Sequence, residues 1–206
     1  MSTLAPLEYF PSELKQSTGN LITILDYFNY FINDEMINEI LKCTNERFSV
    51  EEEPLTVNEL LGYFGLLLLF GVTKKHDIEV SEIWNVESVN HMDWATVGMS
   101  RARFSLISRK ICFDRYRLRT ARSINDPKFF KMRTIFDMFK SNCVNGLTPG
   151  SNLCIDEQLY SFRGRCAFKQ YIPSKPAKYG IKFWAIIDSD SGYLLDTDVY
   201  LGKFTI

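Results

Sequence analysis

The spacing of apolar residues changes at Thr148-Pro149-Gly150, and this change constrains the fold more than any other feature. Before this turn, apolar side chains recur every three or four residues, which is typical of helices that bury one face. After it, they alternate with polar ones, as in half-buried strands. The alternating segments are Asn152 to Phe162, Ile181 to Asp188 and Tyr193 to Leu201. The sequence therefore predicts helices followed by a sheet, with a hairpin turn at Asp190-Ser191-Gly192.

The helical part carries recognisable start signals. Asp34-Glu35 places two acids in the first turn of one helix, where the helix dipole favours negative charge. Thr56 with Glu59 three residues later is a capping-box pattern, and it begins an apolar helix that ends near Val72. Ser100 is a candidate cap for the next basic helix. Two further amphipathic helices are predicted at Asp77 to Trp84 and at Phe130 to Val144.

Length and composition favour a folded intracellular protein. The 206 residues are 46% hydrophobic, which is enough to bury a sizeable core. The longest apolar run, Leu60 to Val72, is shorter than the ~20 residues that span a bilayer, and the amino terminus lacks a signal-peptide pattern. Five widely spaced cysteines favour reduced thiols in an intracellular compartment. We expect all three tryptophans to lie in the core, and they are Trp84, Trp94 and Trp184.

The net charge of −1 conceals a strong asymmetry along the sequence. Residues 1–98 hold sixteen acidic and five basic residues, whereas residues 99–206 hold nine acidic and nineteen basic ones. A basic half is typical of proteins that bind polyanions, but opposite charges also let two halves dock on each other. We therefore predict three regions, which are an acidic helical region at 1–98, a basic helical region of DNA-binding type at 99–150, and the strands at 151–206.

Several short motifs in the basic half occur together. Those after the turn are Ile155-Asp156-Glu157-Gln158, Phe162-Arg163-Gly164-Arg165-Cys166 and the segment from Tyr171 to Lys182. Those before it are Met99-Ser100-Arg101-x-Arg103-Phe104 and Phe113-Asp114, preceded by a Leu-rich helix that ends at Gly71. Together they resemble the piggyBac transposase family, and the resemblance covers about residues 26 to 203. Ala167 departs from the family pattern, which commonly has Pro at that position.

The resemblance implies an α+β fold, in which a mostly helical amino-terminal lobe precedes the first three antiparallel strands of an incomplete ribonuclease H-like core. In the family, the Asp of Ile-Asp-Glu-Gln is the first of three catalytic aspartates, which gives Asp156 a catalytic and metal-binding role. No segment of this sequence matches the second or third catalytic motif, the insertion region or the cysteine-rich zinc-binding tail. Mg²⁺ is therefore implied only for the intact family enzyme, and we expect no cofactor to be bound stably.

One carboxylate is insufficient for phosphodiester cleavage by two metal ions, which several carboxylates hold about 4 Å apart. Glu157 follows Asp156 on a predicted strand, so the two side chains point to opposite faces. The other candidates lie at or beyond the hairpin turn, and they are Asp188, Asp190, Asp196 and Asp198. We therefore expect no catalysis by this chain alone. Apart from the resemblance, an Asp-Glu pair on a strand is more often a surface pair than a site.

Basic residues near these motifs are candidate DNA contacts, because forked guanidinium donors suit phosphate groups. They lie at the start of the basic helix, in a loop with Tyr116 interleaved, and on both sides of the predicted strand segments. The candidates are Arg101, Arg103, Arg115, Arg117, Arg119, Arg122, Arg163, Arg165, Lys169, Lys175 and Lys178. For the loop, a solvated segment that neutralises the acidic half is the alternative.

The sequence leaves three functions open. The first is a transposase-derived fragment, nuclear or otherwise intracellular, that binds DNA weakly through its backbone and has no membrane partner. The second is a protein-interaction module, acting with a partner protein or as a homodimer, or a non-functional truncated remnant. The third is an active DDE transposase or nuclease that another chain completes with the missing carboxylates.

Overall fold

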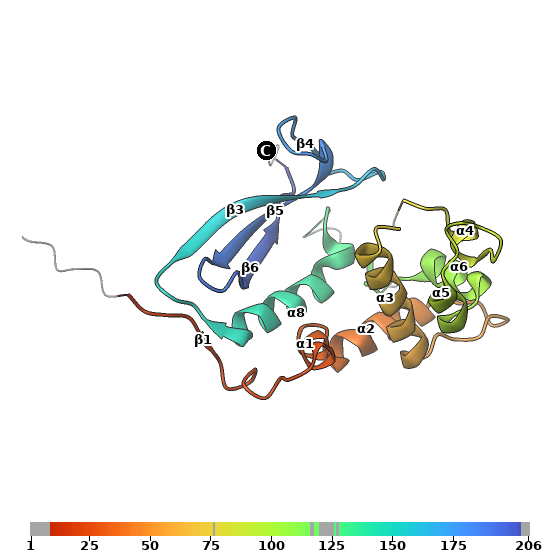
Figure 1. The fold of residues 1–206 in the computed structure, drawn as a ribbon, viewed down its shortest axis with the longest axis horizontal. Helices are drawn as coiled ribbons and strands as arrows, with labels where there is room; N and C mark the ends of the chain where they lie inside the picture. Colours follow the sequence, from red (N-terminus) through yellow and green to blue (C-terminus); the bar gives the residue numbers. More distant parts are fainter. Residues whose placement is uncertain (1–8, 76, 116–117, 120–125, 127, 203–206) are drawn as a thin grey trace, which may run out of the picture. The chain divides into compact units, whose positions relative to one another are not determined.

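The computed structural model describes residues 9–75, 77–115, 118–119, 126 and 128–202, and it contains both helices and antiparallel strands (Figure 1). It divides into two compact units. Unit 2 is continuous and comprises residues 34–120, whereas unit 1 combines residues 1–33 with residues 121–206. Among the helices of the described ranges, none is long and apolar enough to cross a membrane.

Unit 2 is helical, and three of its five helices begin where local signals predict. Its elements are α2 (Asp34–Asn45), α3 (Val57–Val72), α4 (Val80–Trp84), α5 (Asp93–Gly98) and α6 (Arg101–Lys110). The capping box is confirmed, because the Thr56 hydroxyl accepts from the Glu59 N–H while the Glu59 carboxylate accepts from the Thr56 N–H. The Ser100 hydroxyl caps α6 by accepting from the N–H of Arg103.

Two features of unit 2 differ from the prediction. Helix α4 begins at Val80 rather than Asp77, because the N–H of Ile78 closes a turn onto the carbonyl of Lys75. Helix α5 was not predicted, and its six residues are too short to show a helical period. Both helices supply a tryptophan to the core. Phe70 packs against Trp84, Trp94 and Phe104, with ring centroids 6.1, 5.5 and 5.7 Å away.

Unit 1 contains the sheet and the helix that covers it. Its elements are β1 (Glu13–Leu14), α1 (Ile24–Phe31), α8 (Phe130–Gly146), β2 (Leu147–Thr148), β3 (Leu153–Ser161), β4 (Gln170–Tyr171), β5 (Tyr179–Asp188) and β6 (Leu194–Val199). The predicted strands and the hairpin turn are confirmed, with Gly192 at a φ of 71° in the turn. Strands β1, β2 and β4 were not predicted, because each has only two residues.

All strand pairings in the sheet are antiparallel. Strand β3 pairs with β5 along its whole length, from Leu153 opposite Asp188 to Ser161 opposite Gly180. Strands β4 and β6 also pair with β5, β4 at its start and β6 further along. Because β3 occupies one edge of β5 throughout, β4 and β6 share the other edge, end to end.

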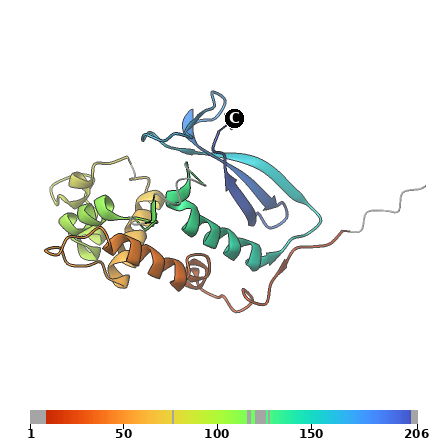
Figure 2. The same ribbon diagram turned by 180° about the vertical axis from the view of Figure 1, so that it is seen from behind.

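Helix α8 covers one face of the sheet, as both views show (Figures 1 and 2). The Phe136 ring lies 6.0 Å from that of Phe183, and Phe129 and Val199 are buried beside them. Trp184 follows Phe183 on β5, so its side chain points to the other face. The prediction of a core position for Trp184 was therefore wrong, since 44% of it is exposed.

The amino-terminal segment belongs to unit 1 through long-range pairing. Strand β1 pairs with β2, which brings Glu13 opposite Thr148, and the N–H of Ser151 donates to the carbonyl of Phe10 at 2.8 Å. The units therefore do not follow the predicted regions 1–98, 99–150 and 151–206. Charge separates less sharply between them, because unit 2 holds fourteen acidic and eleven basic residues and unit 1 holds eleven and thirteen.

Candidate nucleic-acid interface

Asp156 lies in the middle of β3, exposed and opposite Ala185 of β5. Its carboxylate accepts a hydrogen bond from the N–H of Glu157 at 2.7 Å. Alternation along the strand sends the Glu157 side chain to the other face, opposite Trp184, as the sequence predicts. The two carboxylates therefore cannot bind one metal ion together.

Glu157 has basic partners of its own. Its carboxylate forms an ion pair with Lys182, and the Lys175 ammonium lies 3.7 Å from its other oxygen. The Lys175 ammonium also donates to the backbone carbonyl of Glu157 at 3.2 Å. The hydrogen bond from Lys182 is the largest of the effects that lower the pKa of Glu157. The Glu157 carboxylate is thus ionised, and Lys182 and Lys175 balance its negative charge on the face of the sheet opposite to Asp156.

The remaining carboxylates of the sheet also have partners. Buried Asp188 accepts hydrogen bonds from the N–H and hydroxyl of Ser191 and from the N–H of Gly150, and they lower its pKa to about 2. Asp190 accepts hydrogen bonds from the side chains of Tyr9 and Asn152. Asp196 lies 3.3 Å from the Lys140 ammonium, and Asp198 lies 3.9 Å from the Arg133 guanidinium.

The described residues do not fit the magnesium ions that the resemblance implies. Magnesium prefers octahedral oxygen coordination, and a two-ion site needs several converging carboxylates. Within the described ranges, no group of three or more His, Cys, Asp or Glu side chains could hold a metal ion. Asp156 therefore stands as a single carboxylate.

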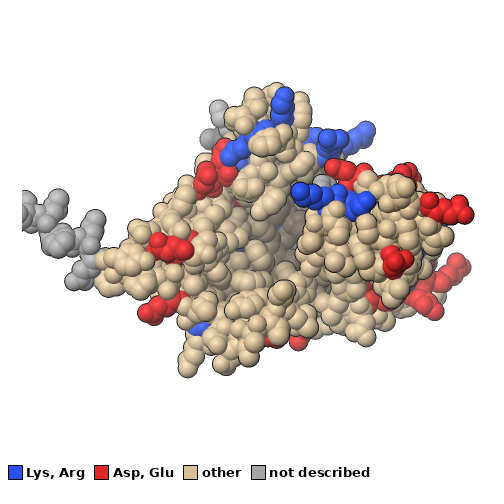
Figure 3. All heavy atoms as spheres, viewed as in Figure 1, with Lys and Arg blue, Asp and Glu red and all other residues tan. Residues whose placement is uncertain are grey.

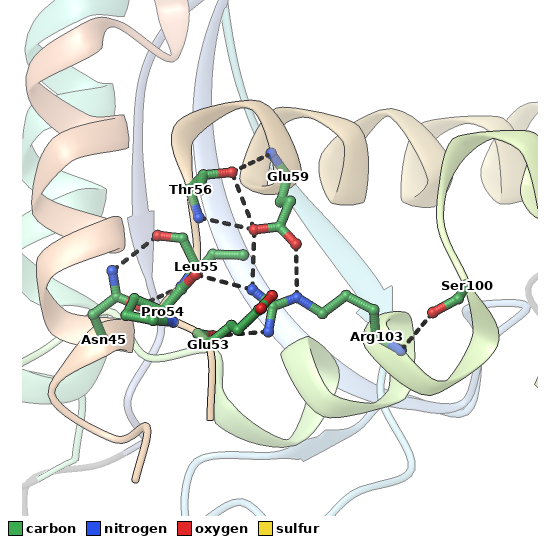
Figure 4. Close-up of polar contacts among 8 residues, drawn as sticks. All are labelled: Asn45, Glu53, Pro54, Leu55, Thr56, Glu59, Ser100 and Arg103. Carbon is green, nitrogen blue, oxygen red and sulfur yellow. Dashed lines mark hydrogen bonds and ion pairs between the residues drawn. The ribbon is translucent and has the colours of Figure 1, made fainter. Parts of the chain in front are cut away.

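Arg103 on α6, a predicted DNA contact, is half-buried and bound to other residues of unit 2 (Figure 4). Its guanidinium forms a bidentate pair with Glu59, with nitrogen–oxygen distances of 2.7 and 3.0 Å. It also donates to the carbonyls of Glu53 and Pro54, and it stacks 5.4 Å from the centroid of Phe48. Only 16% of the side chain is exposed. Four hydrogen bonds leave one N–H of the guanidinium for any other ligand.

Other predicted arginines of unit 2 have acidic partners as well. Arg119 forms a bidentate pair with buried Asp114, at 2.8 and 2.9 Å, and Arg115 lies 3.5 Å from Glu39. Arg101 is exposed at the start of α6 and forms no ion pair within the described part of unit 2. Two predicted contacts and the interleaved tyrosine lie outside the described residues, and they are Arg117, Arg122 and Tyr116.

Among the described residues of unit 1, the predicted basic residues lie on one continuous segment, residues 158–187, which we call the basic segment. It holds six Lys or Arg residues and no Asp or Glu. The Lys169 ammonium donates to the carbonyl of Gly164 at 3.0 Å, which brings it next to Arg163 and Arg165. Figure 3 shows Lys and Arg side chains gathered over the β4 end of the sheet. Among described residues, four of the six have no acidic partner, and three of these four are exposed, namely Arg163, Arg165 and Lys178.

The basic segment also carries exposed rings that were not predicted as site residues. Tyr171 of β4 lies opposite Tyr179 of β5, and their ring centroids are 4.7 Å apart. Each tyrosine is 55% exposed, and Tyr160 and Phe162 at the end of β3 are also exposed. The sequence shows Tyr171 and Tyr179 on either side of a turn with two prolines. The pairing of the two tyrosines could not be predicted, because it depends on β4, which has only two residues.

Known proteins resemble the chain over most of its length. A family described as Transposase IS4 matches residues 24–205. The human piggyBac transposable element-derived protein 3 is 26% identical over 186 residues, which cover 88% of this chain and 30% of the human protein. A solved piggyBac transposase, in a synaptic complex with hairpin DNA, has a TM-score of 0.85 and 33% identity, covering 96% of this chain and 42% of its own.

The chain therefore spans less than half the length of these relatives. Within that span both sequence and fold agree, from helix α1 to the end of the sheet. The antiparallel strands and the preceding helices are those of the solved transposase, and the matched segment includes Asp156 and the whole basic segment. The chain belongs to the piggyBac-type transposase family.

Proposed function

We propose that this chain is a DNA-binding part of a piggyBac transposase-derived protein, and that it contacts the DNA backbone through the basic segment. The observation that carries the proposal is that three exposed cations of this segment, Arg163, Arg165 and Lys178, lack an acidic partner among the described residues. A cation without a protein counter-ion can replace the ions that surround phosphate groups, and their release drives binding.

The proposal gives the arginines of unit 2 a smaller part in DNA binding. Arg103, Arg115 and Arg119 already pair with carboxylates, so a phosphate would have to compete with those partners. The cost of leaving a partly buried carboxylate such as Glu59 unpaired opposes that exchange. The structural relative bound to hairpin DNA supports a nucleic-acid partner, and it is not evidence for which residues of this chain make the contact.

We further propose that strands β3, β5 and β6 correspond to the first strands of a ribonuclease H-like core, with Asp156 in place of the first catalytic aspartate. The antiparallel order of these strands and the likeness to the solved transposase support this assignment. Because Asp156 has no second carboxylate beside it on its face of the strand, and the described residues hold no group of three or more metal-binding side chains, we expect that the chain alone would not cleave DNA. Metal-dependent nicking by the purified chain that Asp156→Asn abolishes would refute the expectation that the chain alone does not cleave DNA.

Fluorescence anisotropy with a labelled duplex, measured across a range of salt concentrations, tests the DNA-binding proposal. The triple variant Arg163→Ala, Arg165→Ala and Lys178→Ala removes three free cations. We expect it to lose about tenfold in affinity and to lower the slope of log affinity against log salt by about 3.

The matched control is Lys42→Ala, Arg109→Ala and Lys131→Ala, which removes the same charge from exposed helix positions. We expect this control to change the affinity less than twofold. An equal loss of DNA affinity in the two triple variants would show that the loss comes from the change in net charge, and it would contradict a localised binding surface.

A protein-interaction role is the second candidate, and one feature of unit 2 favours it. Helix α3 is apolar on nearly all sides, and Leu68 and Val72 are 58% and 80% exposed. Gly62 and Gly65 leave open space beside this face. If the helix binds a partner or a second copy, Leu68→Glu should convert a self-associating or partner-bound species into a monomer in size-exclusion chromatography with light scattering.

A further inference from the structure

We propose that the Tyr171–Tyr179 pair is a stacking platform for unpaired nucleobases of DNA. This inference deepens the proposed function, since it names the kind of DNA that the basic segment prefers. It predicts tighter binding to DNA with single-stranded or splayed nucleotides than to a fully paired duplex.

The geometry of the two rings is the first argument. Tyr171 and Tyr179 are register partners on β4 and β5, so both side chains emerge on the same face of the sheet. Their centroids are 4.7 Å apart with an interplanar angle of 37°, and both are more than half exposed. Exposed aromatic rings offer π-faces on which a base can stack, whatever its identity.

The core of unit 1 does not need these rings for its packing. The segment between β3 and β4 is anchored by buried Phe168, whose ring packs 6.0 Å from that of Phe129. The β4–β5 connection is closed by its backbone, since the N–H of Ile172 donates to the carbonyl of Lys178 at 2.8 Å. Tyr171 and Tyr179 lie outside the buried cluster that these contacts form.

The charges around the pair fit a nucleotide strand. The Lys169 ammonium lies 5.9 Å from the centroid of Tyr179, and Lys178 precedes that tyrosine in sequence. Two acids flank the basic segment: Glu157 is already neutralised by Lys182 and Lys175, and Asp188 is buried and accepts hydrogen bonds from Ser191 and Gly150. Phosphates can thus lie along the cations while a base rests on a ring, which is the arrangement of single-strand binding sites.

Paired and unpaired DNA present different surfaces to such a platform. In a duplex, each base is stacked between its neighbours, so its face is inaccessible to a protein ring. An overhang, a gap or a loop exposes that face. The backbone charges are available in both cases, so the cations alone would not discriminate between them.

The experiment measures binding of the full chain to a duplex with a four-nucleotide overhang and to the same duplex with blunt ends. A 2-aminopurine in the overhang reports stacking through the quenching of its fluorescence. We expect quenching and tighter binding with the overhang. Absence of quenching in the wild-type chain, with both DNAs bound equally, would overturn the stacking platform while leaving the proposed DNA binding intact. Failure to bind either DNA would overturn both.

Two double variants isolate the rings. Tyr171→Phe with Tyr179→Phe keeps the aromatic faces, and we expect it to retain the overhang preference and the quenching. Tyr171→Val with Tyr179→Val keeps strand propensity and removes the rings. We expect the Val variant to lose at least about tenfold in affinity for the overhang, as for one lost stacked base, and less than twofold for the blunt duplex. A Val variant that keeps both the preference and the quenching would contradict the proposal.

Discussion

The arginines of helix α6 and the cations of the basic segment have the same chemistry but different surroundings. On α6, Arg103 meets Glu59, two backbone carbonyls and the ring of Phe48. On the basic segment, Arg163 and Arg165 are exposed and meet no acidic side chain among the described residues. The comparison teaches that an arginine stabilises the fold where a carboxylate lies beside it, and that it stays available to an outside ligand only where no carboxylate does.

The same comparison explains why the charge asymmetry along the sequence is weaker between the two folded units. Acids of the first 98 residues and bases just after them fold into one unit and pair there, as Glu59 with Arg103 and Glu52 with Lys110. The alternative of docking by opposite charges therefore holds inside unit 2. The exposed cations of the basic segment that lack an acidic partner form a local cluster in unit 1, and they do not extend over the whole of residues 99–206.

The largest expected effect separates Arg103 from Arg101, two residues away on α6. We expect Arg103→Ala to lower the free energy of unfolding by about 2–3 kcal/mol, because it removes hydrogen bonds between charged groups and leaves Glu59 without its partner. Arg101→Ala, at an exposed position, should change it by less than about 0.5 kcal/mol. Urea denaturation measures both values. Equal changes would show that Arg103 is no more structural than a surface arginine.

A second prediction compares two carboxylates, Asp188 in unit 1 and Glu59 in unit 2. Hydrogen bonds from Ser191 and Gly150 lower the pKa of Asp188 from its usual 3.8 to about 2. A carboxyl whose pKa is lower in the folded state stabilises the fold fully above its unfolded pKa and loses that contribution as the pH falls through the folded value. The stability advantage of wild type over Asp188→Asn should therefore be constant near neutral pH and shrink between pH 3.8 and about 2.

Thermal melting at a series of pH values measures this advantage, with Asp190→Asn in the same turn as the control. The hydrogen bond from Arg103 lowers the pKa of Glu59, so its contribution also begins to fall below the usual value of 4.5. Because Glu59 is held by a charged partner and Asp188 by neutral donors, added salt should weaken only the Glu59 contribution. An advantage of wild type over Asp188→Asn that persists undiminished at pH 2 would contradict this account.

The smallest expected effect concerns Glu157, the acid that pairs with lysines of the basic segment. Glu157→Gln should free Lys182 and Lys175 and raise DNA affinity about two- to threefold, on the scale of one exposed ion pair. Glu13→Gln removes the same charge from another exposed position of unit 1 and should leave the affinity nearly unchanged. Anisotropy titrations of both variants give the comparison. A similar gain in DNA affinity for Glu157→Gln and Glu13→Gln would show that the gain comes from the change in net charge alone.

Sequence alone predicted the parts of the fold that depend on neighbouring residues. The capping box of Thr56 and Glu59, the cap at Ser100 and the alternation of β3, β5 and β6 are local patterns, and all are confirmed. Strands β1 and β4 were missed because their pairing joins distant or very short segments. Trp184 was placed in the core because the pattern of a strand does not reveal which of its faces a helix covers.

The candidate site was predicted only in outline for a similar reason. The motif around Asp156 and the opposite orientation of Glu157 follow from the sequence, whereas the partner of each arginine does not. Arg103 pairs with a carboxylate forty-four residues away, and only the packing of α6 on α3 brings the two together. The Tyr171–Tyr179 pair likewise depends on the register of β4, which no local pattern reveals.

Lysine footprinting by mass spectrometry, with and without bound duplex DNA, tests the central claim most directly. It compares the chemical modification of Lys169 and Lys178 on the basic segment with that of Lys42 and Lys110 in unit 2 in the same sample. We predict that DNA protects Lys169 and Lys178 and leaves Lys42 and Lys110 unchanged. Protection of the unit 2 lysines without protection of Lys169 and Lys178 would contradict the account.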